Sequence, residues 1–385
     1  MKAILTVLSL IAMSAVAEAA CTYSLAAPRN YVRNPHEREL AGIGSIDMKI
    51  GDVNGDGADD PVFQQEDGRL QVAINDGSGN FTLETLPRTF GYLDINISIS
   101  AGEIAVVDMG HPGYLDPVHV FRRNAAGAWT EERVFDTAAS IARTRDLNGD
   151  GRSEIVLVET GPPQESQISF KILKVVSGVD DGIFFEAPLG RFMVTGIAID
   201  DVTGDGPLDL VVSASYGDPT GPYPAPRDGF VQLFAGRGDG TFETGQTIAS
   251  NVAPFLDPMT GDFNGDGRRD IAFVTGHREL FLMYGTGSGF ATKLQIGGAI
   301  NYVRPADLNR DGITDFVAGF DGVLTVWLGS PDHLTLSDMY WSSDTVWNLA
   351  RLGVGAPYSL ISVADIPARV IDAQCVSSRR RSIGR

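Results

Sequence analysis

A nine-residue, aspartate-rich loop occurs five times in this chain and constrains its fold more than any other feature. The copies begin at Asp52, Asp146, Asp201, Asp262 and Asp307. In every copy oxygen-bearing side chains stand at positions 1, 3, 5 and 9, and a glycine stands at position 6. That glycine permits the backbone dihedral angles that a tight loop needs. Such regular recurrence predicts a repeat protein in which each loop belongs to one structural unit.

The same loops have the composition of a cation site. A hard cation such as calcium binds six to eight oxygens, and a short loop can supply them from alternate positions. One such cluster alone would indicate an ordinary turn, but its repetition at fixed offsets favours a metal. The loop differs from an EF-hand, because it lacks a glutamate at position 12 and flanking helices. We expect up to five Ca²⁺ ions, held by side chains at positions 1, 3, 5 and 9 and the carbonyl at position 7. These residues are Asp52, Asn54, Asp56, Ala58 and Asp60; Asp146, Asn148, Asp150, Arg152 and Glu154; Asp201, Thr203, Asp205, Pro207 and Asp209; Asp262, Asn264, Asp266, Arg268 and Asp270; and Asp307, Asn309, Asp311, Ile313 and Asp315.

Short apolar, β-branched runs follow the loops and predict strands. They occupy residues 61–63, 155–158, 210–212, 271–274 and 316–318. A second run and a glycine-rich turn that closes on an aromatic residue come next, as in Val231 to Phe242. This order is typical of a hairpin. Each unit is therefore predicted to be a small antiparallel sheet.

The spacing of the loops predicts an all-β fold, a β-propeller with seven blades of four-stranded antiparallel sheets. The long interval between Asp52 and Asp146 has room for a decayed copy, which we place at Asp108 to Asp116. A seventh unit without acidic ligands is expected at residues 348–363. Six or eight blades are the alternatives.

The units resemble the FG-GAP and VCBS repeats, the calcium-loop blades of integrin α-subunit propellers and of many bacterial secreted proteins. The resemblance covers roughly residues 40 to 365, and Gly355-Ala-Pro357 is similar to the second element that names the family. It implies that positions 1, 3, 5 and 9 of each loop hold the cation. Two residues depart from the pattern. Thr203 is a weaker ligand than asparagine, and Arg310 replaces a glycine and adds a positive charge beside the fifth site.

The ends of the chain predict export. Residues 1–19 have the basic start, apolar stretch and small-residue end of a signal peptide, and no other run approaches the length of a membrane span. One propeller domain is then expected over residues 20–376, with a basic tail at 377–385. Cys21 and Cys375 are the only cysteines and bracket the repeats, so a disulfide between them is expected in an oxidising compartment. Two free thiols are the alternative, and Glu18 argues against a lipid anchor on Cys21.

Composition restricts the classes of function. The formal net charge is −19, and this charge makes a role in nucleic-acid binding improbable. The five histidines are dispersed without metal-ligand spacing, and no nucleophile or phosphate-binding motif occurs. Acidic pairs are frequent, but the loops account for most of them. A carbohydrate-active enzyme with its site on the propeller face, similar to some polysaccharide lyases, is kept as an alternative.

One irregular segment is a candidate ligand-binding loop. It contains Tyr216, Tyr223, Arg227 and Asp228 on a proline-rich stretch, which could stack on and hydrogen-bond a sugar or a peptide. An inert surface insertion is the alternative, and the four tryptophans are expected mainly to pack between strands. The sequence thus predicts a secreted, extracellular or periplasmic, monomeric module that binds a glycan or a protein without catalysis. A purely structural surface protein is the third class considered.

Overall fold

The computed structural model describes residues 48–337 apart from 59, 66, 77–80, 92–94, 101, 109–115, 161–169, 181, 216–228, 292–293, 298–301, 308–310, 321–322 and 330–334. The described residues form 24 β-strands and no helix. The strands make six sheets of four, each a consecutive antiparallel meander that we call a blade. The predicted all-β class and the four-stranded antiparallel blade are confirmed.

The strands of the six blades have the following bounds. Blade 1 contains β1 (Met48–Gly51), β2 (Asp60–Gln64), β3 (Arg69–Asn75) and β4 (Phe81–Thr89). Blade 2 contains β5 (Ile95–Ser100), β6 (Glu103–Asp108), β7 (Val118–Arg123) and β8 (Trp129–Phe135). Blade 3 contains β9 (Ala139–Arg145), β10 (Glu154–Thr160), β11 (Lys171–Val176) and β12 (Ile183–Gly190). Blade 4 contains β13 (Met193–Asp200), β14 (Asp209–Ser215), β15 (Gly229–Phe234) and β16 (Gln246–Ser250). Blade 5 contains β17 (Met259–Gly261), β18 (Asp270–Val274), β19 (Leu280–Met283) and β20 (Leu294–Gly297). Blade 6 contains β21 (Tyr302–Ala306), β22 (Asp315–Phe320), β23 (Val323–Leu328) and β24 (Thr335–Ser337).

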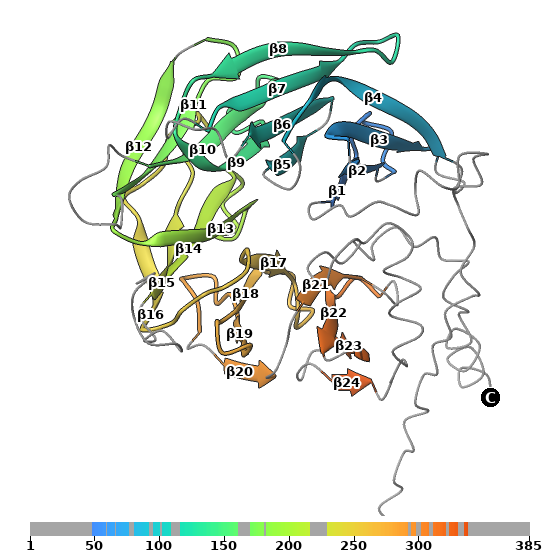
Figure 1. Cartoon of the computed structure of the whole chain (residues 1–385). Coiled ribbons are helices and arrows are strands. Elements are labelled where there is room, and N and C mark those ends of the chain that lie inside the picture. Colours follow the sequence, from blue (N-terminus) through green and yellow to red (C-terminus); the bar gives the residue numbers. More distant parts are fainter. Residues whose placement is uncertain are drawn as a thin grey trace, which may run out of the picture.

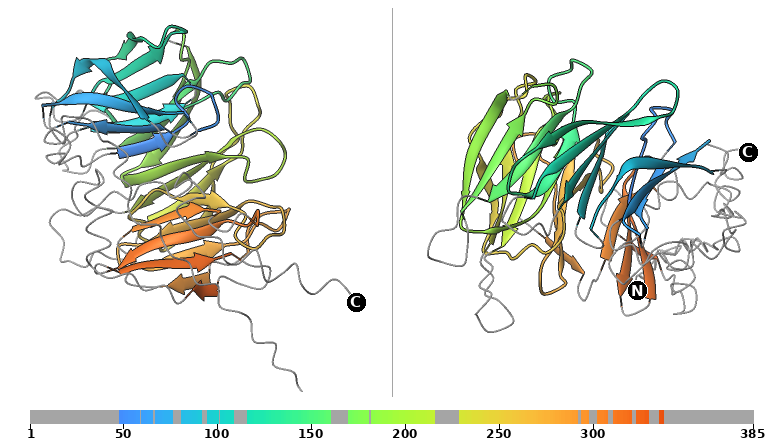
Figure 2. Two further views of the ribbon diagram at one scale, coloured as in Figure 1. Left: turned by 90° about the vertical axis from the view of Figure 1, so that its right-hand side faces the viewer. Right: turned by 45° about the horizontal axis from the view of Figure 1, so that its top comes forward.

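The blades are arranged around a common centre, which makes the fold a β-propeller (Figure 1). The first strand of each blade is innermost, and neighbouring first strands contact one another from β1 through β5, β9, β13 and β17 to β21. The side views show the blades following one another in chain order (Figure 2). The predicted seventh unit at residues 348–363 lies outside the described residues, so seven blades stay a prediction.

Apolar packing between neighbouring blades forms the core. The second strands are buried on both faces, and all side chains of β14 and β18 are buried. One cluster joins Val156 and Leu173 of blade 3 to Leu210 and Val212 of blade 4. Burial of one such leucine stabilises the fold by about 2 kcal/mol. Because these side chains pack between the blades, they also set the spacing between them.

The two described tryptophans behave as the packing prediction expects. Trp129 is 7% exposed and its indole Nε1 donates to Glu84 Oε2 at 2.8 Å. Trp327 is half-buried against the core of blades 5 and 6. Trp129 is therefore too buried to serve as a stacking platform for a ligand.

No helix in the described part of the chain is long and apolar enough to cross a membrane. The predicted signal peptide, the cysteines Cys21 and Cys375, and the basic tail all lie outside the described residues.

Candidate metal sites

All five aspartate-rich loops connect the first strand of a blade to its second strand. They join β1 to β2, β9 to β10, β13 to β14, β17 to β18 and β21 to β22. Because every blade has the same meander order, the five loops lie at the same end of their sheets. The structure therefore places the predicted site residues in five equivalent positions around the ring.

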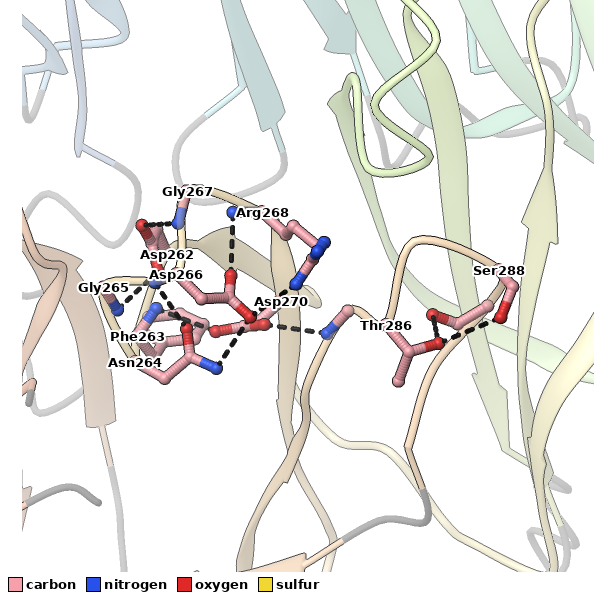
Figure 3. A network of polar contacts seen from close by, with 12 residues as sticks. Asp262, Phe263, Asn264, Gly265, Asp266, Gly267, Arg268, Asp270, Thr286 and Ser288 are labelled. Atoms are coloured by element: carbon pink, nitrogen blue, oxygen red, sulfur yellow. Dashed lines mark hydrogen bonds and ion pairs between the residues drawn. The ribbon is translucent and has the colours of Figure 1, made fainter. Parts of the chain in front are cut away.

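Each loop wraps around the carboxylate of its first aspartate. In the blade 5 loop, Asp262 Oδ1 accepts hydrogen bonds from the backbone N–H groups of Gly265 at 2.6 Å and Asp266 at 3.1 Å (Figure 3). Its Oδ2 accepts from Gly267 N at 2.8 Å. Gly267 has a φ of +80°, which L side chains rarely adopt. Equivalent bonds to the first aspartate occur in the loops that begin at Asp52, Asp146, Asp201 and Asp307.

The side chains at positions 3 and 5 hold each other and the loop backbone. Asn264 Oδ1 accepts from Asp266 N at 3.0 Å, and its Nδ2 donates to Asp266 Oδ2 at 3.2 Å. Asp266 Oδ1 accepts from Arg268 N at 2.9 Å. Asn54 and Asp56 repeat this arrangement in blade 1. These oxygens are therefore gathered on one exposed turn by N–H donors of the loop itself.

The ninth residue behaves differently, because it is the first residue of the second strand and is buried. Asp60, Asp209, Asp270 and Asp315 are each 0% exposed, and Glu154 is 2% exposed. Asp270 Oδ2 accepts from Phe263 N at 2.9 Å, and Oδ1 accepts from Gly285 N at 2.8 Å. The second of these bonds reaches the turn after β19. The ninth carboxylate thus fastens its loop to the third strand of the blade.

The same connection recurs in the other blades with one variation. Asp60, Asp209 and Asp315 accept from Asn75 N, Gly236 N and Gly329 N at 2.7 to 2.8 Å. Glu154 has a longer side chain, and its Oε1 accepts from Asn148 Nδ2 of its own loop at 3.0 Å.

The ninth carboxyls lie close to other negative charges. Burial raises the pKa of Asp270 to about 6, and the charges of Asp266 and Asp262 contribute to the rise. Burial, with repulsion from the carboxylates at positions 5 and 1, also raises the pKa values of Asp60 and Glu154. Each of these loops therefore concentrates three carboxylates that repel one another. In the blade 5 loop this repulsion is partly offset by Arg268, whose Nη1 lies 3.2 Å from Asp266 Oδ2.

The raised pKa of Asp270, caused mainly by burial, gives a testable pH dependence in calcium-free buffer. Folding raises the pKa of the Asp270 carboxyl from its ordinary value of 3.8 to about 6. Its stabilising contribution is complete below the lower value and is lost as the pH rises through the upper one. We expect ionisation of the Asp270 carboxyl alone to lower the free energy of unfolding by up to about 3 kcal/mol as the pH rises from roughly 4 to 7. Urea unfolding in EDTA should show a steeper fall for the wild type than for Asp270→Asn, and equal slopes would contradict the assignment.

The donor set fits calcium, since it consists only of carboxylate, amide, hydroxyl and carbonyl oxygens. Among the described residues, no group of three histidine, cysteine, aspartate or glutamate side chains is arranged as a ready metal site. The oxygens at positions 1 and 5 instead accept the backbone hydrogen bonds given above. A bound cation would have to draw these side chains together within the loop. Asn309 and Arg310 lie outside the described residues, so the fifth loop is only partly defined.

The prediction of a decayed loop at Asp108 to Asp116 is wrong about its place in the blade. Asp108 is the last residue of β6, a second strand, and the segment 109–115 leads to β7. Asp108 therefore lies at the end of the sheet opposite the five loops. The first and second strands of blade 2 are joined only by residues 101–102. Two aspartates between apolar runs look alike in sequence at either end of a sheet, and only strand pairing distinguishes them.

In blade 2 a different residue and partner occupy the start of the second strand, where the ninth carboxylate stands in the other blades. The sequence analysis did not identify this residue. Glu103 is the first residue of β6, and it is 2% exposed. Its Oε2 accepts from Arg122 Nη2 at 2.7 Å. The side-chain hydrogen bond to Glu103 raises the pKa of Arg122 and keeps it charged. Blade 2 thus pairs its buried carboxylate with a guanidinium, and the two-residue link before Glu103 is too short to form the nine-residue loop.

The candidate ligand-binding residues Tyr216, Tyr223, Arg227 and Asp228 lie outside the described residues. In the chain they fall between β14 and β15.

A family model described as the FG-GAP-like repeat matches residues 201–273 and 262–318. The chain contains FG-GAP-like repeats. Both matches begin at the first aspartate of a loop, and each ends in the second strand of the following blade. The match to the family model therefore covers the loops and strands described above in blades 4 to 6.

No curated protein matches the sequence. Among solved structures, the chain is similar to one reported under a title on the recognition of non-reducing terminal N-acetylglucosamine by an Agrocybe aegerita lectin. The identity is 16%, the TM-score is 0.49, and the alignment covers 76% of this chain and 80% of the other.

Proposed function

We propose that this FG-GAP repeat protein is a calcium-stabilised β-propeller that serves as a non-catalytic module for binding an extracellular glycan or protein. The observation that carries the proposal is the set of five equivalent loops, each with hard oxygen ligands on an exposed turn. In this proposal the side chains at positions 1, 3, 5 and 9 and the carbonyl at position 7 hold Ca²⁺. The cation would neutralise carboxylates that otherwise repel one another.

The position of the loops favours a structural role for the metal. Each loop is anchored by its buried second residue, namely Val53, Leu147, Val202 or Phe263 in the four loops where it is described. Phe263 stacks on Phe316 of the next blade with ring centroids 4.3 Å apart. A metal that orders the loop would therefore also order a contact between blades. Ligand recognition is then left to connections other than the aspartate-rich loops.

A glycan array probed with calcium-loaded protein tests the binding role. Saturable binding without product formation supports a binding module. Turnover of a polysaccharide would instead establish the alternative of a carbohydrate-active enzyme. If no glycan binds, immobilised extracellular proteins are the second panel, and absence of any ligand in both panels contradicts the proposed role.

Thr203 offers a test of the metal assignment within one loop. Its side chain is exposed at position 3, where the other four loops have asparagine. A hydroxyl is a weaker ligand than an amide carbonyl, so we expect Thr203→Asn to tighten calcium binding by the blade 4 loop several-fold. Isothermal titration with Ca²⁺ measures the change, and Asp205→Ala should remove the same site. A titration that is identical in wild type and Thr203→Asn would contradict a ligand role for position 3.

We also propose export, with cleavage after residue 19 and a disulfide between Cys21 and Cys375. The support is the signal-peptide pattern and the pairing of the only two cysteines across the repeats. The intact mass of protein recovered from a secreting host shows whether residues 1–19 have been removed. Comparison of the mass with and without reduction shows whether the disulfide is present.

A further inference from the structure

One histidine is buried where the fourth strand of blade 1 packs against blade 2. His119, in β7, is 1% exposed. Strand β4 of blade 1 lies beside β8 of blade 2 (Figure 1), and Phe90 follows β4 directly. The rings of Phe90 and His119 meet edge to face, with centroids 5.4 Å apart. The imidazole ring is therefore part of the contact between the two blades.

Phe90 is fixed to blade 1 and rests on two rings of blade 2. Its N–H donates to Gly68 O at 2.8 Å, and a Cβ atom on Gly68 would lie 2.1 Å from Phe90 O, so this approach requires a glycine. The Phe90 ring also meets Phe121 with centroids 6.0 Å apart, and His119 stacks on Phe121 at 6.4 Å. The three rings thus form one cluster, and a displaced imidazole would change the surface on which Phe90 packs.

The imidazole makes a hydrogen bond through only one of its two nitrogens. Its Nδ1 lies 2.6 Å from Glu131 Oε1 of β8, and because a carboxylate can only accept, Nδ1 donates. In the part of the chain that the structure describes, Nε2 is buried and has no hydrogen-bond partner. In the neutral ring this second nitrogen carries a lone pair and no hydrogen. It is therefore the atom to which a proton adds in acid.

A proton on Nε2 creates a buried donor without an acceptor. Asp108 Oδ2, at the end of β6, is 3.9 Å from Nε2, which is beyond hydrogen-bond distance. An unsatisfied buried donor is unfavourable, and it is more so when it carries a charge. The imidazolium can satisfy Nε2–H only by moving toward Asp108 or toward water. Either movement changes its contacts with Phe90 and Phe121.

Charged groups from three strands act on His119. Glu131 of β8 and Asp108 of β6 favour the imidazolium, whereas Arg88 of β4 opposes it. Arg88 Nη1 also lies 3.2 Å from Glu131 Oε1, the same oxygen that accepts from the imidazole. Burial has the largest effect, and together with Arg88 it outweighs the two carboxylates and lowers the pKa of His119 below its ordinary value of 6.5. The folded contact therefore favours the neutral ring.

A second connection along β4 is insensitive to mild acid. Glu84 accepts from Arg123 Nη2 at 2.7 Å and from the indole Nε1 of Trp129 at 2.8 Å. Burial acts to raise the pKa of Glu84, but the hydrogen bonds from Arg123 and Trp129 outweigh it and hold the pKa below its ordinary value of 4.5. Glu84 therefore stays charged between roughly pH 5 and pH 7. Acidification in this range acts on the contact at His119 and leaves the one at Glu84 in place.

We propose that His119 makes the contact between blades 1 and 2 acid-sensitive: proton uptake on Nε2 releases residues 88–90 from β7, while Glu84 keeps β4 attached to blade 2. The sign follows from the lowered pKa of the folded state. The contact stabilises the fold fully above the unfolded-state pKa of about 6.5, and this stabilisation is lost as the pH falls from that value through the lower pKa of the folded protein. The proposal requires neither the calcium sites nor the glycan or protein ligand.

Hydrogen exchange of calcium-loaded protein at pH 7 and pH 5, corrected for the intrinsic pH dependence of exchange, tests this contact. A state in which the ring is solvated binds a proton with ordinary affinity, so acidification can raise its population by up to about 25-fold. We expect peptides from the end of β4 and from β7 to open about tenfold more often at pH 5 than at pH 7. His119→Gln cannot take up the proton, and its peptides should change less than about twofold.

His277→Gln is the matched control, because His277 is an exposed histidine in the turn between β18 and β19. It removes the same kind of side chain and should leave the opening of β4 and β7 as in the wild type. Changes in the aspartate-rich loops are common to all variants and cancel when variants are compared at one pH.

Two further variants test the contact without replacing His119. Arg88→Gln removes a charge that opposes the imidazolium and should move the opening to higher pH. Glu131→Gln removes a carboxylate that favours the imidazolium and should move it to lower pH. The proposal is overturned if β4 and β7 open equally at both pH values in the wild type, if His119→Gln behaves like His277→Gln, or if Arg88→Gln and Glu131→Gln shift the opening in the same direction.

Discussion

Removal of calcium with EDTA is expected to lower the melting temperature of this protein by about 20 °C or more. One site at a hundredfold excess of ligand over its Kd stabilises a fold by about 2.7 kcal/mol. With an unfolding entropy of about 2.1 cal/mol/K per residue, a domain of roughly 300 residues shifts its melting temperature by about 1.5 °C for each 1 kcal/mol. Five occupied loops would together contribute about 13 kcal/mol and would therefore shift it by about 20 °C. Differential scanning calorimetry in calcium and in EDTA measures the effect directly.

The controls separate calcium from ionic strength and from chelator effects. Adding calcium in excess of EDTA should restore the original transition, whereas magnesium should restore less of it, because it demands a stricter octahedral geometry. A melting curve that EDTA and added calcium both leave unchanged would falsify the calcium assignment for all five loops.

Neighbouring loops are connected, so calcium loss in one loop should weaken the next. The carbonyl of Asp262 in the blade 5 loop accepts from Thr314 N of the blade 6 loop at 2.7 Å. On the other side of the ring, Gly102 N of blade 2 donates to Val53 O of the blade 1 loop at 2.7 Å. A loop that loses its metal therefore also loosens a defined hydrogen-bond partner of its neighbour. For this reason loss of metal from the blade 5 and blade 6 loops should appear as one cooperative transition.

The strands were predictable because each lies next to a strong local signal. The runs expected at 155–158, 210–212 and 271–274 are found within β10, β14 and β18. Apolar β-branched runs bounded by loops leave few alternatives when both faces are buried. The turn predicted between Val231 and Phe242 is closed by a bridge between Gly236 and Phe242.

Features that depend on pairing between distant residues were not predictable from local pattern. Asp108 and Asp116 resemble a loop, yet strand order places them at the opposite end of blade 2. The partners of the ninth carboxylate, such as Gly285 for Asp270, belong to a turn that the loop sequence does not reveal.

Replacement of the ninth carboxylate should be the most damaging single change in a loop. In Asp270→Ala, the buried N–H groups of Phe263 and Gly285 both lose their acceptor. An unsatisfied buried donor costs about 1 to 3 kcal/mol, so in calcium, where the loss of a ligand adds to this, we expect roughly 4 kcal/mol or more. In EDTA the loss should shrink to about 1 to 3 kcal/mol, because the substitution also removes a repelled charge.

Asp239→Ala is the matched control for this measurement. Asp239 is an exposed turn residue whose Oδ1 accepts from Thr241 N at 2.9 Å and which lies outside every metal loop. Its removal should cost less than about 1 kcal/mol, equally in calcium and in EDTA. Urea unfolding of the wild type, Asp270→Ala and Asp239→Ala, in calcium and in EDTA, distinguishes the role of Asp270 as a metal ligand from its role as a hydrogen-bond acceptor. A loss that occurs only in calcium would make it a metal ligand alone, whereas a loss that persists in EDTA shows that its hydrogen bonds also join the loop to the third strand.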